Sequence, residues 1–358
     1  MKFTELSSII GAKRNQYAQE TAMSKEPLNA FRLVSIMDLV SKKLLLELNR
    51  NCRISLQALA RKLDLSVNGV KKRLQKLTEA GIIRGYFIYP TLAMLDAESA
   101  VAILSTTDPT PEESLLDKVG TSPMVYAASI LSTGDALVFA DYEGTKGLAE
   151  LGAHLRQFPE VTKVELHTLI TERGAKCELK TAQLKVLKCL RADARMSISQ
   201  IASETQLTPR RVRKIVKEFL GDGGSDDEFF VKRQSIGDRQ AAQACIYFRV
   251  AWDLNAGGAT AFLVRIERNE QKALIGEVVE WLQQKFPIQF WYAYASATMP
   301  TLFNVFIVDH LRDANPIIKE ISQCPLIDSV KAIFGYPTKR YTGLRELWFE
   351  KMLGQLDD

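Results

Sequence analysis

The sequence lacks long apolar runs. None approaches the roughly 18 consecutive apolar residues that a membrane-spanning helix needs. Its first residues also lack the basic-then-apolar layout and the small-residue cleavage site of a secretory signal. We therefore expect a cytoplasmic protein that has no membrane partner.

Cysteine and histidine are scarce, at five and three residues in a chain of 358. The cysteines lie far apart, form no C-x-x-C pair and are odd in number, which argues against a fully paired disulfide framework. We expect each to be a small apolar filler. No histidine has a second histidine or a cysteine at zinc-finger spacing, so we expect no metal and no other cofactor. The cysteines are Cys52, Cys177, Cys189, Cys245 and Cys324.

Positive charge is modest overall but concentrated in two places. The chain has a net charge of +5. Residues 37–90 hold eleven Lys and Arg against four Asp and Glu, and residues 179–220 hold ten against three. Each segment is therefore strongly basic, and the rest of the chain is acidic. Two compact basic segments indicate two sites for a polyanion, because a merely solvated helix surface does not readily produce the same excess twice.

The two basic segments are copies of one unit. Residues 52–77 align without a gap with residues 194–219. Matching positions keep the side-chain types that a pair of helices buries or uses as caps, as with Ser66 opposite Thr208. A match of this kind indicates a tandem duplication.

Each copy predicts three helices and a strand. In the first copy we expect helices at about 41–50, from Ser55 and from Ser66, whose side chain can cap the third helix. Gly81 is placed to end that helix in the left-handed conformation. The apolar run after it predicts a strand or wing. This order is that of a winged helix-turn-helix.

The second copy follows the same logic. Thr208 is the expected cap, and Pro209 stands at the first helical position, where its missing N–H costs nothing. The run QACIYFRVAW at residues 243–252 reads as an additional strand that has no counterpart in the first copy.

We call each winged helix-turn-helix a head. Downstream of each head, strands and helices are expected in the order βαββαβ, a ferredoxin-like layout. The sequence therefore predicts an α+β protein with two winged helix-turn-helix domains, each followed by a ferredoxin-like sensor domain. The predicted boundaries are 1–36 for an N-terminal extension, 37–92 and 97–172 for the first copy, 177–240 and 243–338 for the second, and 339–358 for a C-terminal helix.

The predicted DNA contacts lie on the third helix and the wing of each head, because a helix-turn-helix inserts that helix into the major groove. Amide side chains suit adenine, lysines suit phosphate, and arginines suit guanine or phosphate. The first set is Ser66, Asn68, Lys71, Lys72, Gln75, Lys76 and Arg84. The second set is Thr208, Arg210, Arg211, Arg213, Lys214, Lys217, Lys232 and Arg233.

Two alternatives stay open for these heads. Either head can be a winged helix kept only for protein contacts, with its basic face merely solvated. In the second head, Asp226, Asp227 and Glu228 stand where a wing approaches phosphate. That acidic loop either repels DNA or is an ordinary polar loop.

The run RISLQALARKLDLS, the cap at Ser66 and the closing GIIRGY resemble the head of the leucine-responsive/asparagine-operon regulators, the Lrp/AsnC or feast/famine family. The resemblance implies a sequence-specific transcriptional regulator that binds double-stranded DNA. It also implies sensors that pair through their sheets and bind an amino acid or another small effector. The family's Gly-Asp-aromatic-Asp element is half present, as Gly134 and Asp135, and is absent at 298–301 in the second copy.

An enzyme is the alternative class. Some proteins that this architecture resembles are sirohaem decarboxylases. The resemblance implies that such an enzyme carries a histidine-cysteine-tyrosine stretch in its sensor strands. The corresponding runs here, at 124–132 and 289–297, contain neither histidine nor cysteine. Since the expected proton donors are missing, we predict that the chain is not an enzyme.

Assembly has two candidate forms. A sensor sheet needs a partner for its apolar face, and the tandem chain can supply one internally or from a second chain. Because operators are commonly palindromic, we expect a homodimer or a higher even oligomer. The aromatic run at 290–294 either packs at the sheet interface or lines a pocket. The C-terminal helix is expected to cover sheet edges or to join protomers.

Overall fold

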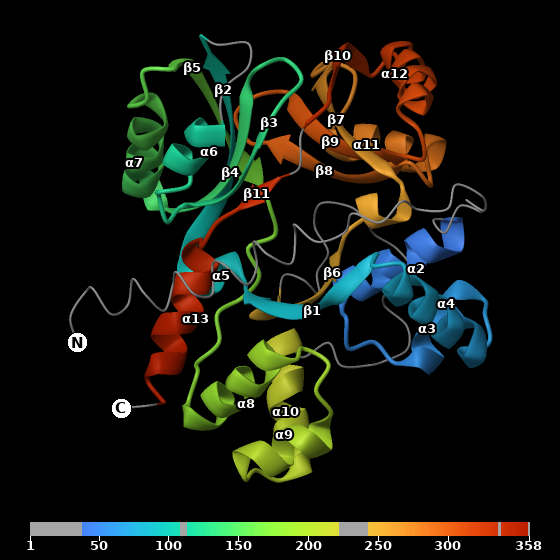
Figure 1. Ribbon diagram of the computed structural model, residues 1–358, viewed down its shortest axis with the longest axis vertical. Helices are drawn as coiled ribbons and strands as arrows, with labels where there is room; N and C mark the ends of the chain where they lie inside the picture. Colours follow the sequence, from blue (N-terminus) through green and yellow to red (C-terminus); the bar gives the residue numbers. More distant parts are fainter. Residues whose placement is uncertain (1–37, 108–112, 222–242, 336–337, 357–358) are drawn as a thin grey trace. The chain divides into compact units, whose positions relative to one another are not determined.

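The computed structural model describes residues 38–107, 113–221, 243–335 and 338–356. The first head, called head one below, has three helices, α2 (Leu39–Arg50), α3 (Leu56–Leu63) and α4 (Val67–Glu79), and leads into strand β1 (Ile83–Pro90) (Figure 1). The hydroxyl of Ser66 accepts a hydrogen bond from the amide of Gly69, and Gly81 has φ +70°. The predicted cap and the predicted left-handed helix end are both confirmed.

The second head, head two below, repeats this arrangement with α8 (Thr181–Ala192), α9 (Ile198–Thr205) and α10 (Pro209–Leu220). Thr208 caps α10 by accepting from the amide of Arg211, and Pro209 occupies the first helical position. Both features follow the prediction. They place the basic run of the second copy on a helix.

Each head is followed by one α/β domain with the predicted βαββαβ order. The strands of each domain lie in the spatial order fourth, first, third, second, as in a ferredoxin-like sheet. The first domain has β2 (Ala97–Thr106), α6 (Glu113–Val119), β3 (Val125–Ile130), β4 (Ala136–Glu143), α7 (Gly144–Arg156) and β5 (Val161–Ile170). The second has β7 (Thr260–Arg268), α11 (Ile275–Lys285), β8 (Phe290–Ser296), β9 (Thr301–Val308), α12 (Ala314–Ser322) and β10 (Ile327–Ile333).

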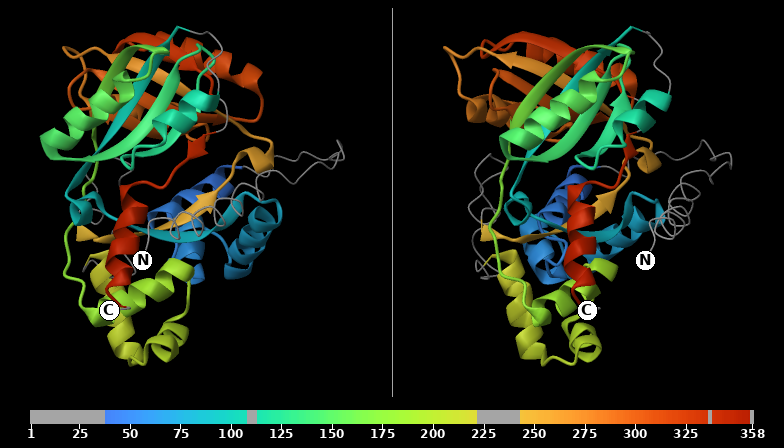
Figure 2. Two further views of the ribbon diagram at one scale, coloured as in Figure 1. Left: turned by 60° about the vertical axis from the view of Figure 1, so that its left-hand side comes forward. Right: turned by 90° about the vertical axis from the view of Figure 1, so that its left-hand side faces the viewer.

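The two α/β domains pair with each other within one chain (Figure 2). The end of β5 pairs antiparallel with the end of β8, through Leu169 opposite Ser296 and Ile170 opposite Ala295. Apolar side chains from both sheets, among them Val101, Leu263 and Phe303, form one shared core. Of the two arrangements left open by the sequence, the described chain takes the internal one.

Strand β6 (Ile246–Trp252) pairs antiparallel with β1, and the two form a ribbon between the heads and the α/β domains. The amide of Ile82, just before β1, donates to the carbonyl of Leu77, and the amide of Cys245, just before β6, donates to the carbonyl of Phe219, the repeat partner of Leu77. The prediction that this strand has no counterpart was therefore wrong, because β6 is the second copy's β1. A longer connection between α10 and β6 obscured the match in the sequence.

Short elements complete the described chain. They are α5 (Leu92–Leu95), the 3-10 turns Asn255–Gly257 and Leu311–Asp313, β11 (Lys339–Arg340) and α13 (Leu344–Gly354). Strand β11 pairs with β3 at that sheet edge, a pairing that was not predicted, and the expectation that the C-terminal helix covers a sheet edge was wrong. Helix α13 instead packs on head two, where Phe349 is 2% exposed. Each helix in the described parts is too short or too polar to cross a lipid bilayer.

Candidate DNA-binding surface and effector cavity

The recognition helix of head one, α4, presents one polar face to solvent. Its buried side chains, Val70 and Leu77, turn inward, and Leu74 is half-buried beside them. The helical period then places the predicted contacts on the opposite face. The exposed members of that set are Ser66, Asn68, Lys71, Lys72, Gln75 and Lys76.

Not every predicted contact of head one is equally available. The side-chain amide of Gln75 donates to Glu79 at 2.7 Å, and Arg84 forms an ion pair with Asp253 at 2.6 Å. No described residue bonds the side chain of Asn68. Among the predicted base-reading residues of α4, Asn68 is therefore the one with no intramolecular partner to lose among the described residues.

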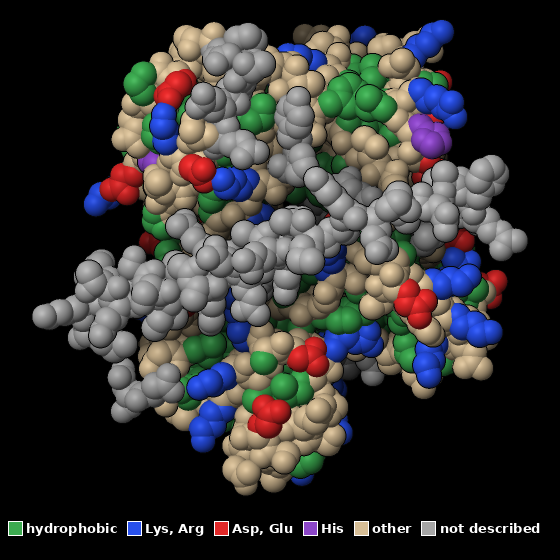
Figure 3. Space-filling view, viewed as in Figure 1, with side chains coloured by type: hydrophobic (Ala, Val, Ile, Leu, Met, Phe, Trp, Pro, Cys, Tyr) green, Lys and Arg blue, Asp and Glu red, His purple; other side chains and the backbone are tan. Residues whose placement is uncertain are grey.

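The recognition helix of head two, α10, is richer in arginine. Its apolar side, which includes Val212 and Phe219, is buried in the core of head two. Arg210, Arg213, Lys214 and Lys217 are exposed, and Arg211 is half-buried. Figure 3 shows several Lys and Arg side chains on the visible face of head one, at the right. Lys232, Arg233 and the acidic run 226–228 lie outside the described residues.

Two equivalent arginines fasten the heads to the ribbon and to each other. Arg53 donates to the carbonyl of Ala194 at 2.7 Å and lies over the ring of Phe248, 6.0 Å from its centre. Its repeat partner, Arg195, lies 4.9 Å from the ring centre of Tyr86. These two positive charges therefore serve cation–π contacts within the protein. Sequence reasoning counted them only as part of the basic segments.

A buried lysine holds head one on the second α/β domain. Lys42 is 2% exposed, and its Nζ donates to the carbonyl of Pro287 at 2.7 Å and to that of Phe290. The ammonium also lies 5.4 Å from the ring centre of Trp291. Burial lowers the pKa of Lys42 to about 7. Trp291, from the aromatic run, therefore packs against head one, a role that sequence reasoning missed.

The aromatic run is divided between the two faces of its sheet. Phe290 is buried in the core of the second α/β domain. Tyr294 packs against Phe139 of the first domain, with ring centres 5.4 Å apart, and contacts the core between the sheets. Of the two roles expected for the aromatic run, packing rather than lining a pocket therefore holds for Phe290 and Tyr294.

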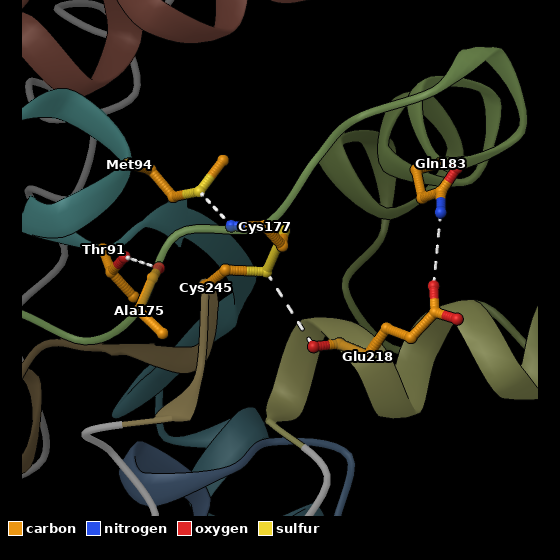
Figure 4. Close-up of a disulfide and its surroundings, with 7 residues drawn as sticks. All are labelled: Thr91, Met94, Ala175, Cys177, Gln183, Glu218 and Cys245. Carbon is orange, nitrogen blue, oxygen red and sulfur yellow. Dashed lines mark hydrogen bonds between the residues drawn. A yellow bond between two sulfur atoms is a disulfide. The ribbon is translucent and has the colours of Figure 1, made fainter.

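One cysteine prediction was wrong. Cys177, in the linker before α8, and Cys245, just before β6, form a disulfide with their Cα atoms 5.9 Å apart (Figure 4). Their separation of 68 residues gave no local signal, since only the fold brings them together. The other three cysteines, Cys52, Cys189 and Cys324, are buried and unpaired, as the filler prediction requires.

A cavity of about 130 Å³ lies between the two sheets, and Asp135 lines it. Gly134 makes the preceding turn with φ +82°, a conformation that favours glycine. Glu165, Arg265 and Lys331 line the same cavity from both domains. Arg265 is paired with Glu165 at 2.6 Å, and this hydrogen bond holds the pKa of Glu165 below its usual range. The cavity therefore offers groups of both charges.

His167 lies next to this cavity, and sequence reasoning gave it no role. It is 1% exposed, with Nδ1 3.1 Å from the hydroxyl of Ser296 and Nε2 3.0 Å from Glu165. Ser296 already accepts bonds from the amides of Thr298 and Met299. His167 thus joins the two domains through a buried polar network.

Comparison with known proteins agrees with the two heads. A family model for winged helix-turn-helix DNA-binding domains matches residues 37–84 and 179–223. An uncharacterised HTH-type transcriptional regulator of Pyrococcus furiosus is 28% identical over 103 residues, which cover 28% of this chain and 69% of the relative. A Pyrococcus horikoshii protein of the same description is 40% identical over 50 residues, covering 14% of this chain and 32% of that protein.

Among solved structures, the sirohaem decarboxylase NirDL is 12% identical, with a TM-score of 0.50, over 89% of this chain and all of that one. The likeness to NirDL is one of fold. AsnC of E. coli is 19% identical over 40% of this chain and 96% of its own, with a TM-score of 0.31. The family match in both copies confirms the predicted pair of DNA-binding heads.

Proposed function

We propose that this chain, an Lrp/AsnC-like protein with two winged helix-turn-helix DNA-binding domains, is a transcriptional regulator that binds one operator with both heads. The observation that carries the proposal is the pair of exposed basic recognition helices on a single chain. Double-stranded DNA is the partner that such helices fit, since lysines meet phosphates while amides and arginines read base edges. Such a protein acts where the chromosome lies, so the expected location is the cytoplasm.

The two heads are unlike, and this defines the operator. Helix α4 offers Asn68 with lysines, whereas α10 offers mainly arginines such as Arg210 and Arg213. In dimeric regulators two equal heads read two equal half-sites about one helical turn apart. Here one chain supplies both heads, and we expect an operator with two unlike half-sites.

The test is selection of genomic fragments by the full chain, followed by affinity measurement at several salt concentrations. Binding to duplex DNA with several phosphate contacts should weaken steeply with salt, by a slope of about 0.9 per contact. Absence of binding at low salt, or binding that ignores salt, contradicts the regulator proposal.

The charged groups that line the cavity between the sheets support the proposal that it binds a small zwitterionic effector. Asp135 can take an ammonium group, and Lys331 with Arg265 can take a carboxylate. The volume of about 130 Å³ limits the ligand to the size of a small amino acid. Calorimetric titration with single amino acids tests this, using Asp135→Asn as the variant that should lose the heat of binding. Equal heats for both proteins contradict the assignment.

The homodimer remains a prediction, but its basis is changed. The apolar sheet face that called for a partner is already covered within the chain by the second α/β domain. A dimer would have to use another surface. Light scattering at micromolar concentration measures the mass, and the mass of one chain would refute the dimer.

A tetrapyrrole-processing enzyme is the second candidate, favoured by the whole-chain fold match to NirDL. Strands β3 and β8 present Tyr126, Tyr292 and Tyr294 on their sheets, with no histidine or cysteine. Regulation therefore fits the side chains better. Adding sirohaem and recording the Soret band separates the two, since a band shift followed by loss of carboxyl groups would support the enzyme.

A further inference from the structure

The Cys177–Cys245 disulfide encloses the whole of head two. Cys177 precedes α8 and Cys245 follows α10, so both chain connections of this head pass through the bonded pair. The linker is also close-packed there: the hydroxyl of Thr91 donates to the carbonyl of Ala175 at 3.1 Å, and the amide of Cys177 contacts Sδ of Met94 at 3.2 Å. Figure 4 shows these side chains gathered around the sulfur atoms.

The same cysteine pair pins the end of the recognition helix. The amide of Cys245 donates to the carbonyl of Phe219 at 3.0 Å, and its Sγ lies 3.9 Å from the carbonyl of Glu218. Both carbonyls belong to the last turn of α10. Holding Cys245 by a covalent bond therefore fixes the C-terminal end of the helix that faces DNA.

We propose that Cys177–Cys245 is a thiol–disulfide exchange site that sets how firmly head two is held, with a dithiol as its reaction partner. This inference rests on the proposed function, which places the chain with chromosomal DNA; in mesophiles, disulfides that form in that compartment commonly have redox roles. Cys177 is half-buried whereas Cys245 is 1% exposed, so Cys177 is the more accessible residue of the pair and the one that we assign to attack by an incoming thiolate.

The exchange balances without another reactant. A thiolate of the dithiol attacks Sγ of Cys177, the bond between the two cysteine sulfurs breaks, and Cys245 leaves as a thiolate and takes up a proton. The second thiol of the dithiol then displaces Cys177, which also ends as a thiol. The protein disulfide gains two electrons and two protons, and the dithiol becomes a disulfide. Reduced Cys245 has the Glu218 carbonyl as an acceptor for its S–H.

Head one provides an internal control, because it has no such pair. Ile82 stands at the position equivalent to Cys245, because its amide donates to the carbonyl of Leu77 as that of Cys245 donates to Phe219, the repeat partner of Leu77. The repeat places Ser35, which precedes the described residues, at the position of Cys177. A change of redox state should therefore act on head two and leave head one as it is.

The test uses the full chain, oxidised with diamide or reduced with dithiothreitol, and measures hydrogen exchange along the sequence. Amides of α8–α10 should exchange at least about tenfold faster after reduction, since local opening is no longer tied by the bond, while those of α2–α4 should stay within about twofold. In the Cys245→Ser variant, the amides of head two should exchange fast, and dithiothreitol should not change their exchange rates. Cys324→Ser, a buried cysteine outside the heads, should behave as the wild type.

A thiol count completes the experiment. Alkylation of the unfolded chain without reductant should label three of the five cysteines after diamide and all five after dithiothreitol. Five labels after diamide, or exchange in head two that does not change on reduction, overturns the proposal. Neither measurement uses DNA, so failure here leaves the proposed regulator function to its own test.

Discussion

Head one is held by a buried lysine and a tryptophan of the second α/β domain, whereas head two is held by a disulfide and the C-terminal helix. Lys42 and Trp291 make the first attachment. Cys245 and Phe349 make the second, and Arg191 of α8 adds an ion pair to Glu346 of α13. The two copies thus share a fold but not the contacts that position it.

This difference has a consequence for regulation. A duplicated unit with identical attachments would answer every signal with both heads. Here the attachment of head one contains a buried lysine, and that of head two contains a disulfide. The divergence of the copies therefore gives the two heads attachments of different chemistry.

Removing the anchor of head two should have the largest effect. Phe349→Ala takes a fully buried ring out of the core that α13 shares with head two, which typically lowers the free energy of unfolding by about 3–5 kcal/mol. Leu347→Ala, on the same helix but 39% exposed, should change it by less than about 1 kcal/mol. Thermal unfolding of both variants checks this, and equal losses would contradict the assigned packing.

The anchor of head one should make stability depend on pH. Burial lowers the pKa of Lys42 from 10.5 to about 7, so between these values the native chain binds fewer protons than the unfolded one. Stability therefore rises with pH across this window, by up to about 1.4 kcal/mol per unit, and this contribution is flat below pH 7.

Lys42→Met should abolish that part of the slope, while Lys43→Met, at an exposed neighbouring position, should keep it. Denaturant unfolding at pH 7, 8 and 9 measures all three proteins. A slope in Lys42→Met equal to that of the wild type would show that Lys42 is charged in its buried site at every pH tested.

The smallest effect is expected on the salt dependence of DNA binding. Lys71 and Lys72 are exposed on α4 and should each meet phosphate. Replacing both with alanine should lower the salt slope by about 0.9 for each phosphate that is no longer bound, with equal weakening on all sequences. Lys43→Ala serves as the matched control, since this exposed lysine lies on α2, away from the recognition helix. A change in base preference would show that the lysines read bases.

The sequence could predict whatever depends on local pattern. The caps Ser66 and Thr208, the glycine after α4 and the βαββαβ order all follow from residue types at fixed spacing. Long-range pairings could not be predicted this way. The bond between Cys177 and Cys245, the burial of Lys42 and the partnership of β6 with β1 depend on which segments the fold brings together. From sequence alone, a charged side chain such as Lys42 is expected to be exposed, because the domain that covers it is not known.

We propose that one chain reads two unlike half-sites, one with each head, and hydroxyl-radical footprinting on a selected operator tests this most directly. Each bound wild-type chain should protect two patches roughly one helical turn, about 10 base pairs, or a multiple of it apart. Asn68→Ala should weaken only the patch of head one, and Arg213→Ala only that of head two, each by about 1–3 kcal/mol in half-site discrimination. A single patch that responds to Asn68→Ala but not to Arg213→Ala, or two patches that weaken together with either variant, would contradict the account.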